Sequence, residues 1–399
     1  MSVTTTAPPA PGLVARLRGV PDVVKLLLFY ALTRVWAAVF IDRAAGHQLP
    51  SIWTDDRSSY FDMAQLWDGQ WYKIIAEQGY PPSLPLDQAG NVQQNPWAFF
   101  PGFPFTVKPV MALTGLPFSV AAVLVNVVLG ACAVYVVMKV LQRVAGRRVG
   151  LWGAALLCAV PSAPALQIAY SESLALLLLA LACWWLLQRS YGLCALAVVA
   201  LALTRPIVAP FALVVLTHLV VRWRHRRTDP FPTSERAQVV GLGLLAAGAS
   251  LIWPVLVGLA VGSSDAYERT QGAWRSGGVI QPFHQSMGIV RLLWGDRGPW
   301  YLAIGAVAYL AVLLSPWGRR VGAELVTWCV AYPFYLLAVT EPWTSTFRYL
   351  LMLFPLCAVL AGALRSRWLV AATAAVGLLW QVHWIDDLLL FMPPTDYPP

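Results

Sequence analysis

The chain has 399 residues, of which 58% are hydrophobic and only 12% are charged. Soluble domains are roughly 45–50% apolar and about 25% charged, so this composition excludes a soluble enzyme or a disordered protein and argues against a nucleic-acid-binding protein. The formal net charge is +9, with 28 Lys and Arg residues against 19 Asp and Glu residues. In a membrane protein such an excess of bases is typical of cytoplasmic loops, so we interpret the charge as a sign of topology.

Apolar runs follow one another along the chain, and a transmembrane helix needs about 20 such residues. The runs are continuously apolar and do not alternate, which argues against a transmembrane β-barrel. They predict an all-α fold, a polytopic helical bundle of about eleven spans that forms a single domain over residues 1–399. The predicted spans are 24–41, 119–141, 149–166, 172–188, 192–204, 206–222, 237–262, 299–315, 323–339, 348–363 and 368–385.

Clusters of Arg and Lys predict which ends of the spans face the cytoplasm. With these clusters inside, residues 1–23 form a cytoplasmic segment, and residues 42–118 and 263–298 form two large extracytoplasmic loops. Three prolines interrupt residues 99–114, so we expect this segment to be a short interfacial or re-entrant piece of the first loop. The clusters are Arg16, Arg18 and Lys25, the stretches 143–148 and 222–227, Arg319 with Arg320, and Arg365 with Arg367.

Four ionisable residues lie at predicted span ends or in the first loop, all on the predicted outer side. They are Asp68, Glu172, Arg205 and Arg348. Ionisable groups that a bilayer makes costly to bury are functional candidates by default. Each has a structural alternative: Glu172 can cap a helix, the arginines can reach lipid headgroups, and Asp68 can be a solvated loop acid. The presence of two acids and two bases on one side favours a reaction centre.

The first outer loop also mixes carboxylates with aromatic residues, which suits a carbohydrate or a lipid headgroup. Trp67, Trp71 and Tyr72 carry this pattern, although an aromatic belt at the membrane interface explains it as well. The adjacent acids Asp55 and Asp56 could hold a cation, but such a pair is more often surface charge. The cysteines all lie in apolar runs and no glycine-rich phosphate loop occurs, so we predict neither a metal site nor a nucleotide-binding domain.

Residues 67–80, Trp-Asp-Gly-Gln-Trp-Tyr-Lys-Ile-Ile-Ala-Glu-Gln-Gly-Tyr, resemble the Trp-Asp…Ile-Ala-x-x-Gly-Tyr signature of the PIG-V family, the GPI mannosyltransferase 2 type, and of its bacterial relatives. Further elements similar to those of the family follow in the expected order, and the resemblance runs from about residue 24 to 365. One departure is Gly102-Phe103, where a Leu-Tyr-like pair is expected. The further elements are Phe-Phe-Pro-Gly-Phe-Pro at 99–104, Tyr-Ser-Glu-Ser at 170–173, Thr-Arg-Pro at 204–206, Gln-Gly-Ala-Trp-Arg at 271–275 and Phe-Arg-Tyr at 347–349.

The resemblance implies an integral-membrane glycosyltransferase of the GT-C type in the plasma membrane. It would transfer mannose from polyprenyl-phosphate mannose, with inversion, to a hydroxyl group of a glycolipid or lipoglycan acceptor on the extracytoplasmic face. The resemblance makes Asp68 the general base, and Glu172 could exchange roles with it. Arg205 and Arg348 would bind the donor phosphate, because Arg can bind phosphate bidentately. No cofactor or metal is expected beyond the lipid-linked donor. Predicted substrate-binding residues are Trp67, Trp71, Tyr72, Tyr170, Asp62, Trp274 and Arg275.

Two other classes of function remain open at this point. A secondary transporter or a flippase of a lipid-linked sugar would be expected to show internal repeats and interrupted helices at the membrane midplane. No repeat is visible, and the polar candidates gather at one face, although Arg34 in the first predicted span suits a transporter equally well. A non-catalytic membrane scaffold would not need Asp68 and Glu172 on the same side.

Overall fold

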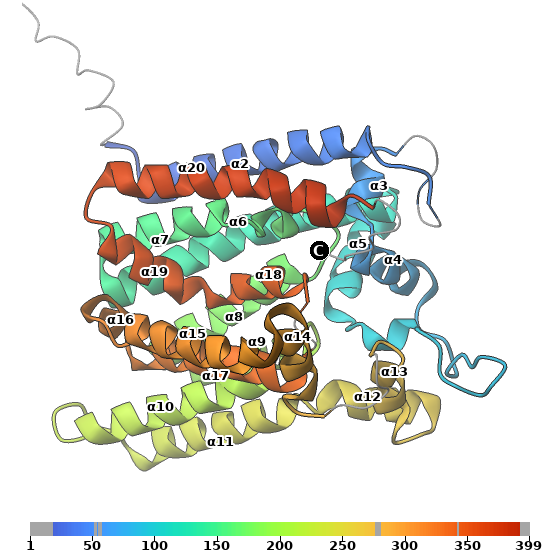
Figure 1. Cartoon of the computed structure of the whole chain (residues 1–399). Coiled ribbons are helices and arrows are strands. Elements are labelled where there is room, and N and C mark those ends of the chain that lie inside the picture. The colour runs from blue at the N-terminus through green and yellow to red at the C-terminus, as the bar shows by residue number, and fades with distance from the viewer. Residues whose placement is uncertain (1–18, 52–53, 55–57, 276–280, 341–342, 392–399) are drawn as a thin grey trace, which may run out of the picture.

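The computed structural model describes residues 19–51, 54, 58–275, 281–340 and 343–391. Across these residues the chain is helical and has no β-strand, apart from one isolated bridge between Leu86 and Val92. This confirms the predicted all-α fold class (Figure 1). The α-helices are α2 (Asp22–Ala45), α3 (Tyr60–Ala64), α4 (Asp68–Gln78), α5 (Gly102–Thr114), α6 (Phe118–Ala145), α7 (Arg147–Ala159), α8 (Glu172–Leu187), α9 (Tyr191–Ala202), α10 (Ala209–His225), α11 (Thr233–Ala249), α12 (Ile252–Val261), α13 (Ala266–Gly272), α14 (His284–Trp294), α15 (Gly298–Leu313), α16 (Pro316–Arg320), α17 (Ala323–Val339), α18 (Thr346–Tyr349), α19 (Phe354–Ala363) and α20 (Arg367–Trp384). Short 3₁₀ segments cover Pro96–Ala98, Ala163–Leu166, Gly295–Arg297 and Leu350–Leu353, and a π turn covers Ile385–Leu389.

In the described part of the chain, four helical segments are long and apolar enough to cross a membrane. They are α2, α6, the run Thr346–Ala363 and the run Arg367–Leu389. Helices α11 and α12 form a fifth if this pair, bent by 46°, is one span. Helices α8, α9 and α17 are apolar but shorter. The predicted membrane protein is therefore supported, while the count of about eleven spans stays a prediction.

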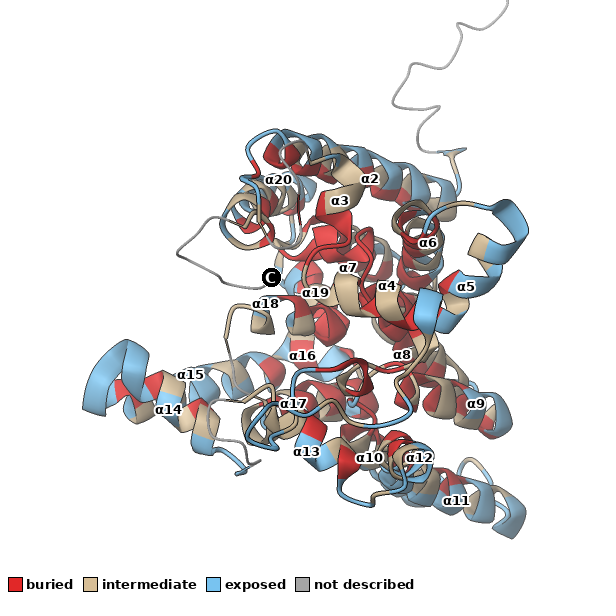
Figure 2. Ribbon diagram, turned by 90° about the vertical axis from the view of Figure 1, so that its right-hand side faces the viewer, coloured by how far each residue is buried: buried red, intermediate tan, exposed pale blue. Residues whose placement is uncertain are grey.

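The helices place apolar side chains on the outside of the bundle as well as in its core. Leu32, Leu244 and Trp300 are each more than two-thirds exposed. A helix that is apolar all round belongs in a protein core or in lipid, so these outer faces suit a hydrocarbon environment. Figure 2 shows the buried residues gathered where α7, α8 and α19 meet, with exposed faces on the peripheral helices α11 and α14.

The first predicted outer loop contains the short helices α3, α4 and α5, as expected. Helix α5 has only 13 residues and includes Pro109, which removes one helical hydrogen bond. It ends at Gly115, whose φ of +71° is a left-handed conformation that glycine adopts without steric cost. Helix α5 is therefore too short to span, in agreement with the expectation for residues 99–114.

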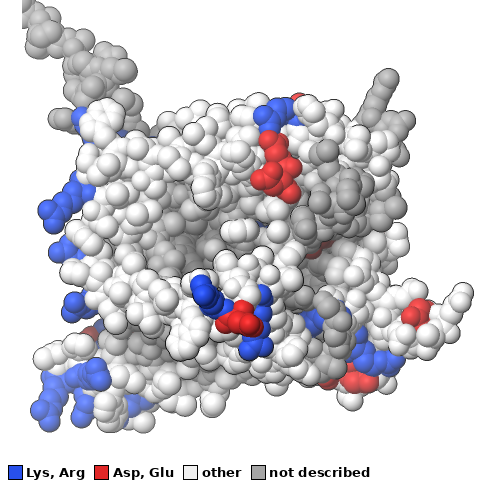
Figure 3. All heavy atoms as spheres, in the orientation of Figure 1, with Lys and Arg blue, Asp and Glu red and all other residues white. Residues whose placement is uncertain are grey.

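The basic clusters that the sequence assigns to the cytoplasm, where they are described, lie at one end of the bundle, which we call the basic end. The turn between α6 and α7 lies there beside the start of α2, because Arg147 forms an ion pair with Asp22. Arg148 donates hydrogen bonds to the carbonyls of Leu364 and Arg365 in the turn between α19 and α20. Lys and Arg side chains line this edge of the molecule in Figure 3, whereas α3, α4, α5 and α13 lie at the opposite end in Figure 1. Arg16 and Arg18 fall outside the described residues.

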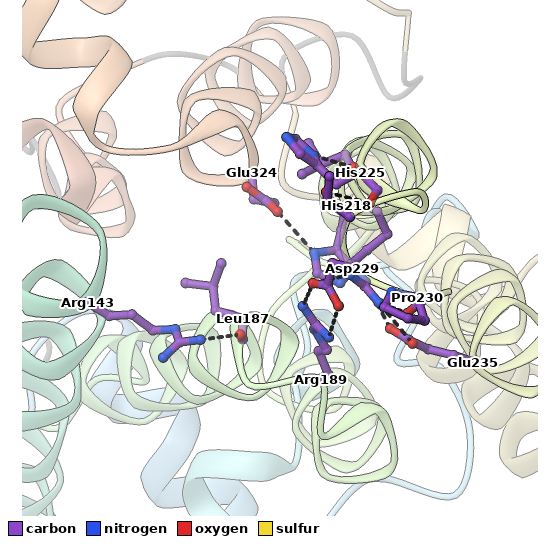
Figure 4. A network of polar contacts seen from close by, with 12 residues as sticks. Arg143, Leu187, Arg189, His218, His225, Asp229, Pro230, Glu235 and Glu324 are labelled. Carbon is purple, nitrogen blue, oxygen red and sulfur yellow. Dashed lines mark hydrogen bonds and ion pairs between the residues drawn. The ribbon is translucent and has the colours of Figure 1, made fainter. Parts of the chain in front are cut away.

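A polar network fixes α9, α10, α11 and α17 at the basic end (Figure 4). The buried Arg222 of α10 pairs with Asp229 at 2.6 Å and with Glu235 of α11 at 3.0 Å. His218, one turn earlier in α10, pairs with Glu324 of α17 at 3.0 Å. The buried Arg222 therefore has two carboxylates as partners, as burial of a charged group requires.

A buried break in the helices leads to the start of α8. Helix α7 ends at Ala159, and the predicted span 149–166 stops there because Pro161 and Pro164 cannot continue a helix. Carbonyl groups freed inside a membrane must find donors within the protein. Arg34 of α2 donates to Ala163 at 2.6 Å, and Gln381 of α20 donates to Cys158 and Val160, both at 3.1 Å.

Asn126 of α6 completes this set by donating to the carbonyls of Ile168 and Tyr170. These hydrogen bonds hold the backbone directly before Glu172, the first residue of α8. The break is therefore rigidly attached to α2, α6 and α20. Arg34, which suited a transporter at the level of sequence, has a structural partner in this arrangement.

We predict that Asn126→Leu, a substitution of similar volume, lowers the free energy of unfolding by about 1–3 kcal/mol, because two buried carbonyls lose their donor. Thermal unfolding in detergent measures the change. Val128→Ala on the exposed side of α6 is the control and changes stability by less than about 0.5 kcal/mol. Equal unfolding temperatures for Asn126→Leu and the control would contradict the role of Asn126.

Candidate functional site

The four ionisable candidates form one cluster at the end of the bundle opposite the basic end. Asp68 begins α4, Glu172 begins α8, Arg205 lies in the turn between α9 and α10, and Arg348 lies in α18. Nη1 of Arg348 is 2.6 Å from Oδ2 of Asp68 and 3.2 Å from Oε1 of Glu172. Nη1 of Arg205 is 2.5 Å from the same Oε1. Residues separated by up to 280 positions in the sequence therefore form a chain of ion pairs, Asp68–Arg348–Glu172–Arg205.

The four side chains differ sharply in their access to solvent. The side chain of Glu172 is 0% exposed and that of Arg348 is 4% exposed, against 12% for Arg205 and 24% for Asp68. Burial alone would lower the pKa of Arg205, but the adjacent Glu172 carboxylate raises it above its ordinary value. Glu172 is thus a buried counter-ion between two permanent cations, and Asp68 is the carboxylate that faces outward.

Aromatic rings and a hydroxyl group hold the two arginines in place. The guanidinium of Arg348 lies 4.8 Å from the ring centre of Tyr170, and that of Arg205 lies 4.8 Å from the ring centre of Tyr349. Such contacts are favourable because the ring face is electronegative. Ser171 accepts from Tyr72 at 3.0 Å and from Arg205 at 3.4 Å. The Tyr-Ser-Glu element therefore supplies three successive residues to the cluster.

A cavity of about 410 Å³ lies over the cluster, within the range of small-molecule sites. Asp68 and Arg205 reach its wall, whereas Glu172 and Arg348 lie behind it. The wall is mainly aromatic, with a few amide, hydroxyl and guanidinium groups. It is formed by Asp68, Tyr72, Ala98, Phe99, Phe100, Thr204, Arg205, Pro206, Ile207, Ser250, Tyr267, Gln271, Trp274, Arg275, Tyr332, Tyr335, Leu336, Val339, Thr340 and Tyr349.

Most of the predicted substrate-binding residues lie in or beside this cavity. Tyr72, Trp274 and Arg275 are on its wall. Trp71 lies behind the wall, stacked on Phe99 with ring centres 5.8 Å apart and edge-on to Trp274 at 5.3 Å.

The other predicted binding residues lie elsewhere. Tyr170 is fully buried beneath Arg348, and the ring of Trp67 packs edge-on against Phe391. Asp62 accepts from the backbone and hydroxyl of Ser59 in a capping box at the start of α3, and it is not on the cavity wall. Asp55 and Asp56 fall outside the described residues. Within the described ranges, no group of three or more His, Cys, Asp or Glu side chains could hold a metal ion.

Several wall residues were not among the sequence candidates. Tyr332 and Tyr335 are three positions apart on α17, a spacing that places both on one helix face. Tyr349 on the wall and Ser171, which contacts Arg205 but is not on the wall, are sequence neighbours of Arg348 and Glu172, and this adjacency is the signal that could have identified them. Tyr267 and Gln271 come from the second predicted outer loop, which has no charge pattern that would select them.

Trp67 places Asp68 by means of an unusual backbone conformation. Its φ of 59° and ψ of −117° lie in a region that residues other than glycine rarely adopt. The turn directs the chain into α4 so that Asp68 is the first helical residue. Strain of this kind costs about 1–3 kcal/mol and is frequent at functional sites.

Comparison with known proteins gives a fold but no family. No protein family and no curated protein matches the chain. The structure is similar to that of ArnT from Cupriavidus metallidurans bound to undecaprenyl phosphate, with a TM-score of 0.52 and 16% identity over 90% of this chain. This chain covers 63% of the ArnT chain. The archaeal oligosaccharyltransferase AglB from Archaeoglobus fulgidus, in complex with an inhibitory peptide and a dolichol-phosphate, also matches, with a TM-score of 0.42 and 12% identity over 93% of this chain and 56% of that one.

The likeness to ArnT at this identity shows a shared fold only. The GT-C type and membership of the PIG-V family both stay predictions.

The difference in burial predicts different effects on stability for the two acids. Glu172→Gln leaves Arg205 and the buried Arg348 without their common counter-ion, so we expect a loss of about 3–5 kcal/mol. Asp68→Asn removes a partly exposed carboxylate, and we expect a loss of less than about 1 kcal/mol. Thermal unfolding of both variants in detergent measures the contrast. If Asp68→Asn unfolds first, Glu172 is not the anchor of the cluster.

The strain at position 67 predicts that glycine is better tolerated there than alanine. Both variants lose the indole ring, so their difference reports the backbone. We expect Trp67→Gly to be more stable than Trp67→Ala by about 1 kcal/mol, whereas glycine is elsewhere the less stable of the two. Paired thermal unfolding checks this order, and a more stable alanine variant would refute the strain.

Proposed function

We propose that this protein is an integral-membrane glycosyltransferase, specifically a mannosyltransferase. In this proposal it transfers mannose from polyprenyl-phosphate mannose, with inversion, to a hydroxyl group of a lipid-linked or glycolipid acceptor. The observation that carries the proposal is the carboxylate of Asp68, which faces a cavity, pairs with the buried Arg348 and shares the cavity wall with Arg205. Such a transfer requires a proton acceptor and a cationic site for a leaving phosphate, and both are within one cluster.

The chemistry assigns a separate role to each charged residue. Asp68 takes the proton of the acceptor hydroxyl as its oxygen attacks C1 of the sugar. The bond between C1 and the phosphate oxygen breaks, and its electron pair leaves with the phosphate. Arg205 and Arg348 stabilise the developing negative charge by charge-assisted hydrogen bonds. A single displacement of this kind inverts the anomeric centre.

Glu172 is a poorer choice of base than Asp68 in this proposal. It has no exposed surface, and its Oε1 atom accepts from both arginines. A carboxylate held in this way is stabilised in its charged form and has no path to an acceptor hydroxyl. Its proposed role is to orient Arg205 and Arg348 toward the donor phosphate.

Three further observations support parts of the proposal. ArnT, whose fold is similar, is bound to undecaprenyl phosphate, and this supports a lipid-phosphate donor here. The cluster lies opposite the basic end, and the positive-inside rule then supports an extracytoplasmic site in the plasma membrane. The aromatic wall with Phe99 and Trp274 suits the apolar face of a sugar. The choice of mannose is carried by the resemblance to the PIG-V family.

A transfer assay tests the proposal directly. Purified protein receives polyprenyl-phosphate mannose with a radiolabelled sugar and a glycolipid extract, and labelled glycolipid is the product. We expect Asp68→Asn to lower kcat by about 10²–10⁴-fold, as for loss of a general base. Glu77→Gln, an exposed acid on the same helix, is the matched control and keeps full activity.

Three outcomes of this assay would contradict parts of the proposal. Full activity of Asp68→Asn would show that Asp68 is not the catalytic base. Movement of the intact labelled donor across proteoliposome membranes without sugar transfer would identify a flippase. Equal use of polyprenyl-phosphate glucose would contradict the proposed specificity for mannose.

The orientation has a separate test, in which a cysteine at the exposed position Ala89 is labelled from one side of the membrane. Labelling only from the cytoplasm would contradict the proposed extracytoplasmic site.

A further inference from the structure

We propose that Arg348 exchanges its ion-pair partner when the lipid-phosphate donor binds. In the structure it holds Asp68, and in the proposed complex it holds the phosphate group, so that Asp68 is released as a base only after the donor has bound. This inference rests on the proposed function and adds an order of events to it.

The geometry shows which partner can be exchanged. Nη1 of Arg348 contacts Glu172 on one side and Asp68 on the other. Glu172 is fully buried, is also held by Arg205 and begins a helix whose preceding backbone is fixed by Asn126. Asp68 has the most exposed side chain of the cluster and lies on the cavity wall. An anion that enters the cavity therefore meets the Asp68 side of Arg348, and Asp68 is the group that it displaces.

The ion pair between Asp68 and Arg348 also opposes the proposed role of Asp68 as a base. Oδ2 of Asp68 lies 2.6 Å from Nη1 of Arg348, so this oxygen is engaged by the guanidinium and is not available to an acceptor hydroxyl in the cavity. Asp68 thus needs to lose this contact before it can act. The donor phosphate, by displacing Asp68 from Arg348, breaks this contact, and no other group is needed.

The charges of the cluster balance in both states. Two arginines and two carboxylates give a net charge of zero without ligand. When Asp68 moves away, Arg205, Arg348 and Glu172 together carry one positive charge, which matches the single negative charge of a phosphodiester. During transfer the proton from the acceptor neutralises Asp68, and the broken C1–O bond adds one negative charge to the phosphate. The negative charge therefore passes from Asp68 to the phosphate, and Arg348 is adjacent to both.

This exchange has a consequence that a simple base would not have. Asp68 competes with the phosphate for Arg348, so its removal should improve binding of a lipid phosphate while it abolishes transfer. We expect Asp68→Asn and Asp68→Ala to lower the Kd for undecaprenyl phosphate by about tenfold, since a charge-assisted contact is no longer lost on binding. We expect Arg348→Met to raise the Kd by at least a similar factor.

The experiment is a titration of the full-length protein in nanodiscs with undecaprenyl phosphate, followed by tryptophan fluorescence. Undecaprenol, which lacks the phosphate, measures binding of the chain alone, and inorganic phosphate measures the anion site without the chain. Glu77→Gln controls for the loss of one negative charge on α4. Two variants at Asp68 are included so that poor folding of one does not prevent the test.

The outcomes separate the exchange from the proposed function. If the wild-type protein binds undecaprenyl phosphate no better than undecaprenol, the lipid-phosphate donor of the proposed function is wrong. If it prefers the phosphate, but the Asp68 variants bind with unchanged or weaker affinity, only the exchange is wrong. If Glu77→Gln lowers the Kd for undecaprenyl phosphate as much as Asp68→Asn does, the exchange is also wrong, because the effect would then come from the overall charge.

Discussion

The site depends on one constraint, which is that a carboxylate with no exposed surface must have cations against it. Glu172 meets this requirement with a single oxygen, Oε1, that accepts from both Arg205 and Arg348. Because those arginines come from the α9–α10 turn and from α18, the need to neutralise one acid brings three distant parts of the chain together. Asp68 then joins through Arg348 and attaches α4 to the same centre. An uncompensated charge at such depth would cost several kcal/mol, so removing one member of the cluster destabilises the contacts among these segments.

The same constraint applies to the uncharged backbone around the site. A carbonyl group without a donor is costly in a low-dielectric interior, and the break between α7 and α8 exposes several. Side chains from α2, α6 and α20 donate to them, and these helices form much of the bundle on that side. The start of α8 is thus held both from its backbone and from its first side chain. Rigid support of this kind keeps the proposed reacting groups within the narrow geometry that catalysis requires.

Much of this arrangement can be predicted from the sequence, because it follows from local patterns. Apolar runs predicted the helical class, and Asp68, Glu172, Arg205 and Arg348 were selected because charge at the end of an apolar run needs an explanation. Other sequence patterns were compatible with more than one structural role. Ser59-x-x-Asp62 has the spacing of a capping box, yet an aromatic-rich loop also suited a binding acid. The sequence could not decide whether Asp68 or Glu172 is the base, because the exposure of each side chain depends on which helices pack over it.

The unequal burial of the two acids is the basis for the different roles proposed for them. A carboxylate that is fully enclosed by cations is fixed in charge and position, and it can only organise its neighbours. A carboxylate with one cationic neighbour and one open side can change its partner and its protonation state. Environment, and not residue type, assigns such roles in other acid–base sites as well. In this protein the difference in burial arises from where each helix begins. Helix α8 begins inside the bundle, after the 160–171 break, whereas α4 begins at the cavity, after the strained turn at Trp67.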